Sequence, residues 1–214
     1  MSAPDGRPFN IRNEFRAMST EQIKEITKSQ SLPYAVMALN IISDLNIANM
    51  IRAVNICACR KMVILGRKKM DYRGCVGAQN YVDIDKVSAL INPDLRDFDS
   101  LTQDDVDNII DSDIFIDYII QNDYIPVFIE QDSTSIPATD TNIKEIFSKA
   151  ESINKMPIFI FGNESFGIPK NILDTRSIFP LAITLELKQM GCIRSFNVAN
   201  CCSILCYKIM ENIS

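Results

Sequence analysis

The stretch Pro33–Arg52, PYAVMALNIISDLNIANMIR, contains the unit that decides the fold. Residues Tyr34–Ile41 are almost all apolar, which is typical of a strand buried on both faces of a parallel sheet. Directly afterwards, apolar residues recur every three or four positions from Ile47 to Ala58, the spacing of a helix with one buried face. A buried strand followed at once by such a helix predicts an α/β protein.

The same alternation continues along the chain. We expect further buried strands at 62–65, 125–129, 157–161 and 181–185, and helices beginning near Ser19, Asn142 and Ser195. Residues 71–85 indicate a loop, and the sequence from there to Tyr118 indicates two polar helices separated at Pro93. Together these elements predict a doubly wound, mostly parallel sheet flanked by helices.

Length and composition are those of one globular domain with a short extension. The 214 residues are 47% hydrophobic and 23% charged, far from the composition of disordered chains. We divide the chain into an N-terminal arm, residues 1–32, and a main domain, residues 33–214. Because no apolar run is long enough for a signal peptide or a membrane span, we expect a cytoplasmic protein without a membrane partner.

The side-chain inventory excludes several kinds of site. The sequence has no histidine, and its seven cysteines show no paired CxxC spacing, so we expect neither a metal site nor histidine catalysis. We interpret the cysteines of the predicted helices as small buried hydrophobic residues. Phosphate-loop and nicotinamide fingerprints are absent, and the aspartates between Asp94 and Asp123 lack EF-hand spacing.

Polar residues recur where predicted strands are followed by helices. They are Asn46 with Arg52, Gly162 with Glu164, and Ser195 with Asn197. Ligands of open α/β sheets bind beyond the carboxyl ends of the strands. The three segments therefore predict one composite site.

Each segment also has an ordinary structural explanation. Asn46 and Ser195 can cap their helices, Arg52 can be a solvated helix residue, and Glu164 can be an exposed turn residue. Asn197 is harder to explain, since it begins an otherwise apolar helix. A polar side chain there needs a partner, and we interpret that partner as a ligand or a second chain.

Net charge is −5 at pH 7, which argues against a nucleic-acid partner. The charge is nevertheless uneven, because acidic residues concentrate between Asp94 and Asp123. The segment Arg60–Arg73 is rich in Lys and Arg, and the arm adds Arg7, Arg12 and Arg16. We therefore predict a local basic surface.

In order and separation, the polar segments resemble the three motifs of the SpoU family, the TrmH-like branch of the SPOUT methyltransferases. The matching positions are Asn46 and Arg52, then Gly162 and Glu164, then Ile183, Gly191, Ser195 and Asn197. The resemblance spans Pro33 to the end of the chain. It implies a SPOUT fold with a C-terminal trefoil knot, and an obligate homodimer whose active site is completed by the partner chain.

The resemblance also implies a reaction, the transfer of a methyl group from S-adenosylmethionine to a ribose 2′-hydroxyl of RNA, with tRNA favoured over rRNA. The implied cofactor-binding residues are Ile129, Glu130, Gly162, Ile183, Gly191, Ile193 and Ser195. The implied catalytic residues are Arg52, Asn46, Glu164, Ser195 and Asn197. Because a guanidinium stays protonated, we assign Arg52 to phosphate anchoring and alkoxide stabilisation. We expect RNA contacts at Arg67, Lys68, Lys69 and Arg73.

Several positions depart from the family pattern. Ala48-Asn49 replaces a common glycine, Thr184 replaces the usual proline after Ile183, and Phe196-Asn197-Val198-Ala199 replaces Leu-Asn-Val-Ser. None of these changes removes a polar catalytic candidate. The alternative interpretation is a catalytically silent SPOUT-fold dimer that binds RNA or serves in assembly.

Overall fold

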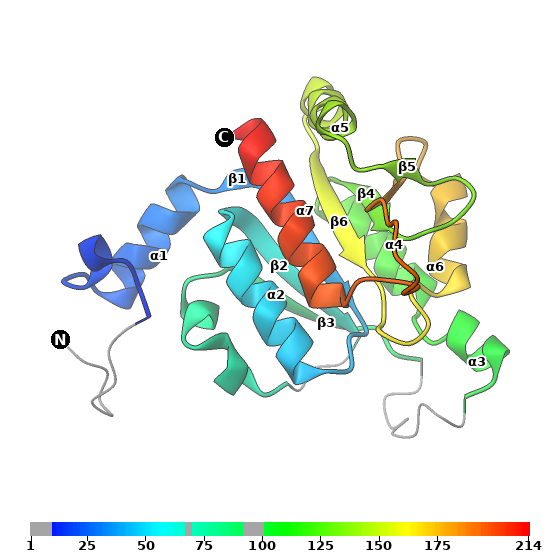
Figure 1. Ribbon diagram of the computed structural model, residues 1–214, viewed down its shortest axis with the longest axis horizontal. Helices are drawn as coiled ribbons and strands as arrows, with labels where there is room; N and C mark the ends of the chain where they lie inside the picture. Colours follow the sequence, from blue (N-terminus) through cyan, green and yellow to red (C-terminus); the bar gives the residue numbers. More distant parts are fainter. Residues whose placement is uncertain (1–9, 67–69, 92–100) are drawn as a thin grey trace.

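The computed structural model describes residues 10–66, 70–91 and 101–214. Within them, seven strands form one sheet in the order β3-β2-β1-β6-β4-β7-β5, and every neighbouring pair is parallel (Figure 1). The strands are β1 Leu32–Leu39, β2 Cys59–Gly66, β3 Ile84–Ser88, β4 Tyr124–Ile129, β5 Ile136–Pro137, β6 Met156–Phe161 and β7 Ile183–Glu186. The predicted parallel α/β sheet is confirmed.

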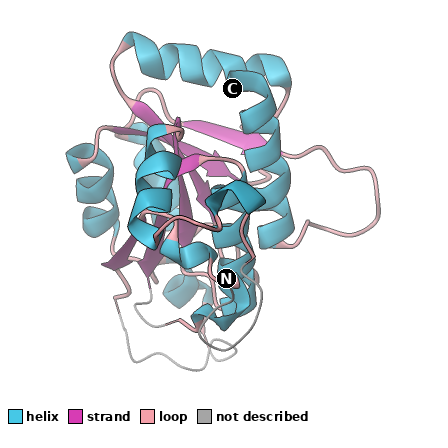
Figure 2. Ribbon diagram, turned by 90° about the vertical axis from the view of Figure 1, so that its left-hand side faces the viewer, coloured by secondary structure: helices cyan, strands magenta, loops and turns pink. Residues whose placement is uncertain are grey.

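Helices cover both faces of this sheet (Figure 2). They are α1 Thr20–Ser29, α2 Asp44–Ile56, α3 Gln103–Asp107, α4 Ser112–Gln121, α5 Asp140–Ser152, α6 Lys170–Asp174 and α7 Val198–Ile213. Side chains of α2, α5 and α7 form one hydrophobic core with one face of the sheet, and those of α4 and α6 form a second core with the other face. Successive residues of β1 alternate between the two cores, which explains its uninterrupted apolar sequence.

One predicted element is wrong. Residues Ile84–Ser88 span the end of the expected loop and the start of an expected helix, but they form the edge strand β3, which pairs in parallel with Met62–Gly66 of β2. Asp85 of this strand lies 3.0 Å from Lys61 Nζ and accepts a hydrogen bond from the Tyr118 hydroxyl at 2.7 Å. Because an edge strand is only partly buried, its sequence carries too weak an apolar pattern to distinguish it from a polar helix.

Other predicted boundaries agree more closely. Ser19 and Gln22 form a capping box at the start of α1, as the sequence predicts. The expected helix break at Pro93 lies outside the described residues, and β5 is too short to have been predicted. Among the described residues, no helix is long and apolar enough to cross a membrane. The trefoil knot stays a prediction.

Candidate active site

Helix α2 begins before Asn46. Its cap is Ser43, whose hydroxyl oxygen accepts a hydrogen bond from the backbone N–H of Asn46 at 3.4 Å. The predicted cap at Asn46 is therefore wrong, because an earlier polar residue already occupies that role. As the third residue of the helix, Asn46 has a side chain available for contacts with other segments.

The carboxylate of Glu164 receives hydrogen bonds from the segment around the start of α2. Its Oε2 accepts from the N–H of Ile42 at 2.9 Å, and its Oε1 accepts from the N–H of Ser43 at 3.0 Å. Oε1 also accepts from Asn46 Nδ2 at 2.8 Å. Three donors fix the orientation of this carboxylate although Glu164 is exposed. Glu164 is thus a turn residue whose side chain is held by hydrogen bonds to the start of α2.

Asn197, and not Ser195, caps helix α7. Its Oδ1 accepts hydrogen bonds from the backbone N–H groups of Ala199 at 2.9 Å and Asn200 at 3.3 Å. Its Nδ2 donates to Asn46 Oδ1 at 3.0 Å. The expectation that Asn197 needs a ligand or a second chain as its partner is wrong, because the cap and Asn46 provide its partners. Ser195 is exposed and precedes the helix.

The result is a continuous hydrogen-bonded chain Glu164–Asn46–Asn197, which we call the amide chain. Its two links join residues 118 and 151 positions apart. One residue comes from each of the three segments that the sequence singles out. The fold therefore brings Asn46, Glu164 and Asn197 together.

The turn after β6 has no space for side chains at its two glycines. A Cβ on Gly162 would lie 2.3 Å from the carbonyl carbon of Gly167 and 2.4 Å from the nitrogen of Ile168. Gly167 has a φ of +74°, and a Cβ there would lie 2.5 Å from Glu130 Oε2. Asn163 and Gly167 close the turn with reciprocal backbone hydrogen bonds of 2.9 Å. The backbone after β6 is thus packed closely and exposed to an adjoining cavity.

That cavity, of about 490 Å³, lies beyond the carboxyl ends of β4, β6 and β7. Its volume falls in the range of small-molecule sites. The predicted site residues in its wall are Ile129, Glu130, Gly162, Glu164, Ser195 and Asn197. Asn46, on α2, lies outside the wall and reaches it through its hydrogen bonds to Glu164 and Asn197. Also outside the wall are Ile183, at the start of β7, and Gly191 and Ile193, in the exposed segment between β7 and α7.

Sequence reasoning missed part of the wall. Gln131, Glu186, Leu187, Gln189 and Arg194 also line the cavity. The available signal was positional, because most of these residues follow β4 or β7 and ligands gather beyond the carboxyl ends of strands. Among the residues that the structure describes, the charged side chains of the wall are three carboxylates, Glu130, Glu164 and Glu186, and the guanidinium of Arg194.

Arg52 lies apart from the cavity wall. It is half-buried on α2, near Cys75 of the turn at Tyr72–Cys75. Burial raises the pKa of the Cys75 thiol to about 11, and the positive charge of Arg52 acts in the opposite direction. Within one chain, the structure thus does not bring Arg52 to the cavity wall that contains Glu164 and Asn197.

The predicted RNA-binding residues are only partly described, because Arg67, Lys68 and Lys69 lie outside the described residues. Arg73 is 91% exposed, and its Nε donates to Asp71 Oδ2 at 2.6 Å. Carboxylates from outside the basic segment also neutralise part of its charge. Lys61 also pairs with two carboxylates of the segment at β3, Asp83 at 3.5 Å and Asp85 at 3.0 Å.

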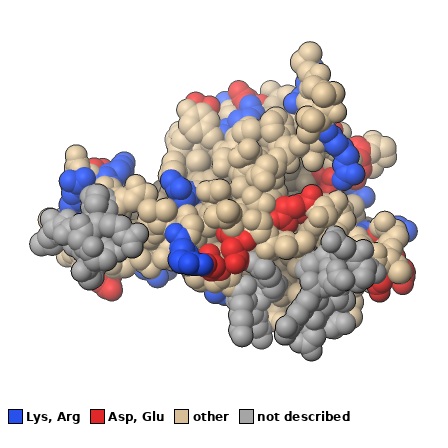
Figure 3. Space-filling view, turned by 60° about the horizontal axis from the view of Figure 1, so that its bottom comes forward, with Lys and Arg blue, Asp and Glu red and all other residues tan. Residues whose placement is uncertain are grey.

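The surface of the described residues shows how these charges are distributed. In the view of Figure 3, Lys and Arg side chains are scattered among Asp and Glu, and the described residues on this face form no continuous basic patch. On this face, a basic surface formed by the described residues is therefore limited to small groups of side chains.

Comparisons with known proteins bear on the fold. No protein-family model and no curated protein matches the sequence. The TrmH/SpoU tRNA modifying enzyme of A. aeolicus is similar in structure, with a TM-score of 0.62 and 15% identity over 90% of this chain and 81% of that one. An AdoMet-bound rRNA methyltransferase from Sinorhizobium meliloti has a TM-score of 0.59 and 15% identity over 90% of this chain and 60% of that one.

The SpoU methyltransferase AviRb from Streptomyces viridochromogenes is also similar, with a TM-score of 0.54 and 14% identity over 83% of this chain and 58% of that one. The chain thus spans less than two thirds of the length of the last two proteins. At these identities the similarity establishes the fold and confirms the expected SPOUT architecture. The chain has the fold of the TrmH/SpoU methyltransferases.

Proposed function

We propose that this protein is an S-adenosylmethionine-dependent RNA ribose 2′-O-methyltransferase, with tRNA as its first candidate substrate. The observation that carries the proposal is the amide chain, which joins one residue from each polar segment at the edge of a cavity of about 490 Å³. The fold is that of proteins described as a tRNA modifying enzyme and an AdoMet-bound rRNA methyltransferase.

The cavity fits the cofactor in size and charge. S-adenosylmethionine supplies an electrophilic methyl group on a positively charged sulfonium. In the described part of the wall, the carboxylates of Glu130, Glu164 and Glu186 outnumber the guanidinium of Arg194, which favours a cationic ligand. The side-chain-free backbone at Gly162 allows a ligand to approach closely. We assign the cofactor to the backbone at Ile129–Glu130, the Gly162 turn and the segment after β7.

The amide chain supports a role at the reacting oxygen. An amide NH₂ group has two donors, and one donor of each Asn is used, by Asn46 toward Glu164 and by Asn197 toward Asn46. The second N–H of each group is available to a substrate oxygen. Donors held in place before the reaction stabilise the negative charge that appears on a ribose oxygen when its proton leaves, before the oxygen takes the methyl group from the sulfonium. Ser195, exposed at the same wall, adds a hydroxyl.

The role of Arg52 in this proposal is to anchor a phosphate and to stabilise the alkoxide. Since Arg52 lies outside the cavity wall of its own chain, we propose that it serves a site completed by a second copy. Helices α2 and α7 lie side by side (Figure 1). Together they expose apolar side chains, with Ile56 70%, Tyr207 51% and Ile204 38% exposed. Such a face is suited to a homodimer contact.

The test is methyl transfer from labelled S-adenosylmethionine to total tRNA and, separately, to rRNA, followed by nucleoside analysis. We expect a 2′-O-methylnucleoside from the tRNA reaction that is lost with Arg52→Ala. If the same nucleoside formed only in rRNA, the proposed reaction would stand and the substrate would be rRNA. A base-methylated product would contradict the proposal.

A measurement of cofactor binding distinguishes an inactive enzyme preparation from the catalytically silent dimer. At a ligand concentration about a hundredfold above Kd, S-adenosylhomocysteine should stabilise the folded protein by about 2.7 kcal/mol. Absence of both stabilisation and transfer would favour the silent RNA-binding dimer.

Sedimentation of the native chain and of Tyr207→Glu tests the proposed homodimer contact between copies of α2 and α7, which the added charge should disrupt.

A further inference from the structure

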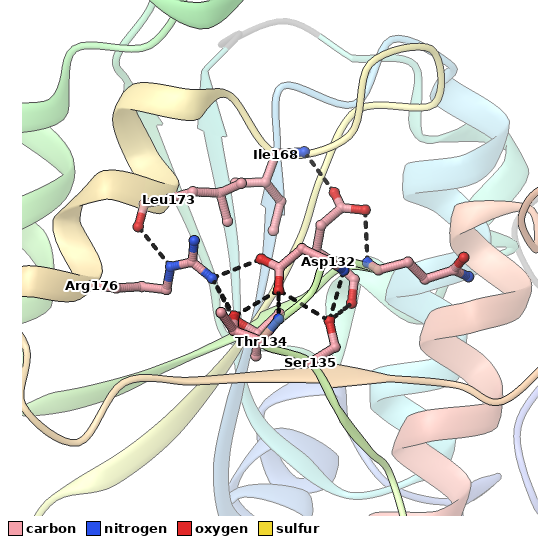
Figure 4. Close-up of polar contacts among 9 residues, drawn as sticks. Asp132, Thr134, Ser135, Ile168, Leu173 and Arg176 are labelled. Atoms are coloured by element: carbon pink, nitrogen blue, oxygen red, sulfur yellow. Dashed lines mark hydrogen bonds and ion pairs between the residues drawn. The ribbon is translucent and has the colours of Figure 1, made fainter.

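The guanidinium of Arg176 contacts several segments near the cavity (Figure 4). Its Nη1 donates to Asp132 Oδ2 at 2.7 Å, Thr134 Oγ1 at 3.0 Å and Thr184 Oγ1 at 2.9 Å. Its Nε donates to the carbonyl oxygen of Leu173 at 2.9 Å. We call Arg176, Asp132, Thr134 and Thr184 the guanidinium clamp.

The partners of Arg176 belong to segments that line the cavity, and Arg176 itself lies beyond a third such segment. Asp132 and Thr134 follow Glu130 and Gln131, which are cavity residues at the end of β4. Thr184 lies in β7 immediately before Leu185, Glu186 and Leu187, which are also in the wall. Arg176 follows α6, the helix entered from the Gly162–Gly167 turn. The side chain of Arg176 thus joins the wall segments at β4 and β7 to the chain that continues from the wall segment after β6.

Hydrogen bonds within the loop after β4 connect Asp132 of the clamp to Glu130 at the cavity. Ser135 Oγ donates to the carbonyl oxygen of Glu130 at 2.9 Å and accepts from the N–H of Asp132 at 2.8 Å. The carboxylate of Glu130 accepts hydrogen bonds from the N–H groups of Gln131 at 3.0 Å and Ile168 at 3.1 Å. A displacement of Asp132 would therefore displace Glu130, which faces the cavity.

The ion pair of the clamp is partly shielded from water. The side chains of Arg176 and Asp132 are 30% and 25% exposed, and Thr184 is 4% exposed. Partial burial strengthens a hydrogen-bonded ion pair relative to one in open solvent. The clamp is thus better suited to holding a fixed geometry than an exposed surface pair.

We propose that Arg176 is a positioning residue that fixes the three walls of the cavity relative to one another. This inference rests on the proposed function. It also gives a role to Thr184, which stands where the SpoU pattern has a proline. A proline has no hydroxyl to accept the bond from Arg176, so the departure at Thr184 matches the presence of the clamp.

Binding of S-adenosylmethionine and S-adenosylhomocysteine, measured by calorimetry on the full chain, tests the clamp. We expect Arg176→Gln to raise Kd about tenfold, because misplaced binding groups lose most of their contribution. Arg176→Lys should recover part of the affinity, since it keeps the charge without the forked geometry. Thr184→Val, which removes only the hydroxyl acceptor, should raise Kd about threefold.

Lys208→Ala is the matched control. Lys208 is 33% exposed and lies 2.9 Å from Asp140, so this pair also joins two elements, α7 and α5. Lys208 is not in the cavity wall. Loss of this pair should leave Kd unchanged. Equal Kd values for Arg176→Gln and Lys208→Ala, at similar losses of stability, would overturn the proposal.

Hydrogen exchange keeps this test separate from the proposed function. In the ligand-free protein, Arg176→Gln should accelerate exchange at residues 130–135, whereas Lys208→Ala should not. If the native chain binds no S-adenosylmethionine, the proposed function fails, and faster exchange at 130–135 still supports positioning by Arg176. Unchanged exchange at residues 130–135 would overturn the positioning role of Arg176.

Discussion

The amide chain and the guanidinium clamp lie at the same cavity but are held by different forces. The amide chain links Glu164, Asn46 and Asn197 through exposed or half-buried side chains at the starts of two helices. The clamp centres on an ion pair, 2.7 Å between Arg176 Nη1 and Asp132 Oδ2, behind the wall. The difference suggests a division of roles, in which available amide donors face a substrate and a shielded ion pair keeps the wall in place.

The largest expected effect tests the backbone that both regions share. Gly162→Ala would place a Cβ 2.3 Å from the Gly167 backbone, and we expect a loss of about 3 kcal/mol in the free energy of unfolding together with loss of cofactor binding. Urea denaturation and calorimetry measure the two quantities. Gly191→Ala is the control for stability, because a Cβ there meets nothing within 4 Å. Equal stability of the two variants would contradict the close packing of this turn.

A second prediction breaks the amide chain at its charged end. Glu164→Gln leaves one acceptor oxygen and introduces donors toward the N–H groups of Ile42 and Ser43, so its hydrogen bonds cannot all form. We expect kcat to fall about a hundredfold, with a loss of about 1 kcal/mol in stability. Single-turnover methyl transfer measures the first and urea denaturation the second. A variant with native kcat would remove Glu164 from the proposed site.

A third prediction separates capping from catalysis within one residue. Asn197→Asp keeps the oxygen that caps α7 but loses the donor to Asn46. We expect stability within about 0.5 kcal/mol of the native chain and a tenfold fall in kcat, whereas Asn197→Ala should also lose about 1 kcal/mol of stability. If both variants lost stability and activity in parallel, Asn197 would be only a cap.

The smallest expected effect is a pH dependence of the free energy of unfolding, which distinguishes the guanidinium clamp from the amide chain. Desolvation alone would raise the pKa of Asp132, but hydrogen bonds from Thr134 and Arg176 lower it to about 2. Because the folded-state pKa lies below the unfolded value of about 3.9, this stability is present above pH 4 and is lost as pH falls toward 2. Asp132→Asn should therefore be less stable than the native chain by about 1 kcal/mol at pH 7.

Urea denaturation at pH 7, 4 and 2.5 measures this difference. The gap between the native chain and Asp132→Asn should narrow over the acid range. A gap that is constant with pH would show that the charge of Asp132 does not contribute to the clamp. In the amide chain, the side chains of Asn46 and Asn197 are uncharged. Measurements on Asn197→Asp at neutral pH therefore provide the comparison with the ion pair of the clamp.

The two regions also differ in how far the sequence predicted them. The sequence could single out Asn46, Glu164 and Asn197, because each follows a strand whose apolar sequence predicts it. Arg176 was not singled out, because its partners Asp132 and Thr184 are 44 and 8 positions away and no local pattern relates them. The caps of α2 and α7 were predicted wrongly for a similar reason. Ser43 and Asn46 are both good capping residues, and the contact of Asn46 with Glu164 decides between them.

The sequence by itself determined the alternation of buried strands and helices, because an apolar run or a helical apolar spacing reports burial locally. It also determined which polar residues stand at the strand ends. Only the tertiary structure decided that β3 is a strand, which polar residues cap α2 and α7, and that one guanidinium joins the segment after β4 to β7. Those outcomes depend on hydrogen bonds between distant segments, whose partners are chosen when the chain packs and leave no periodicity in the sequence.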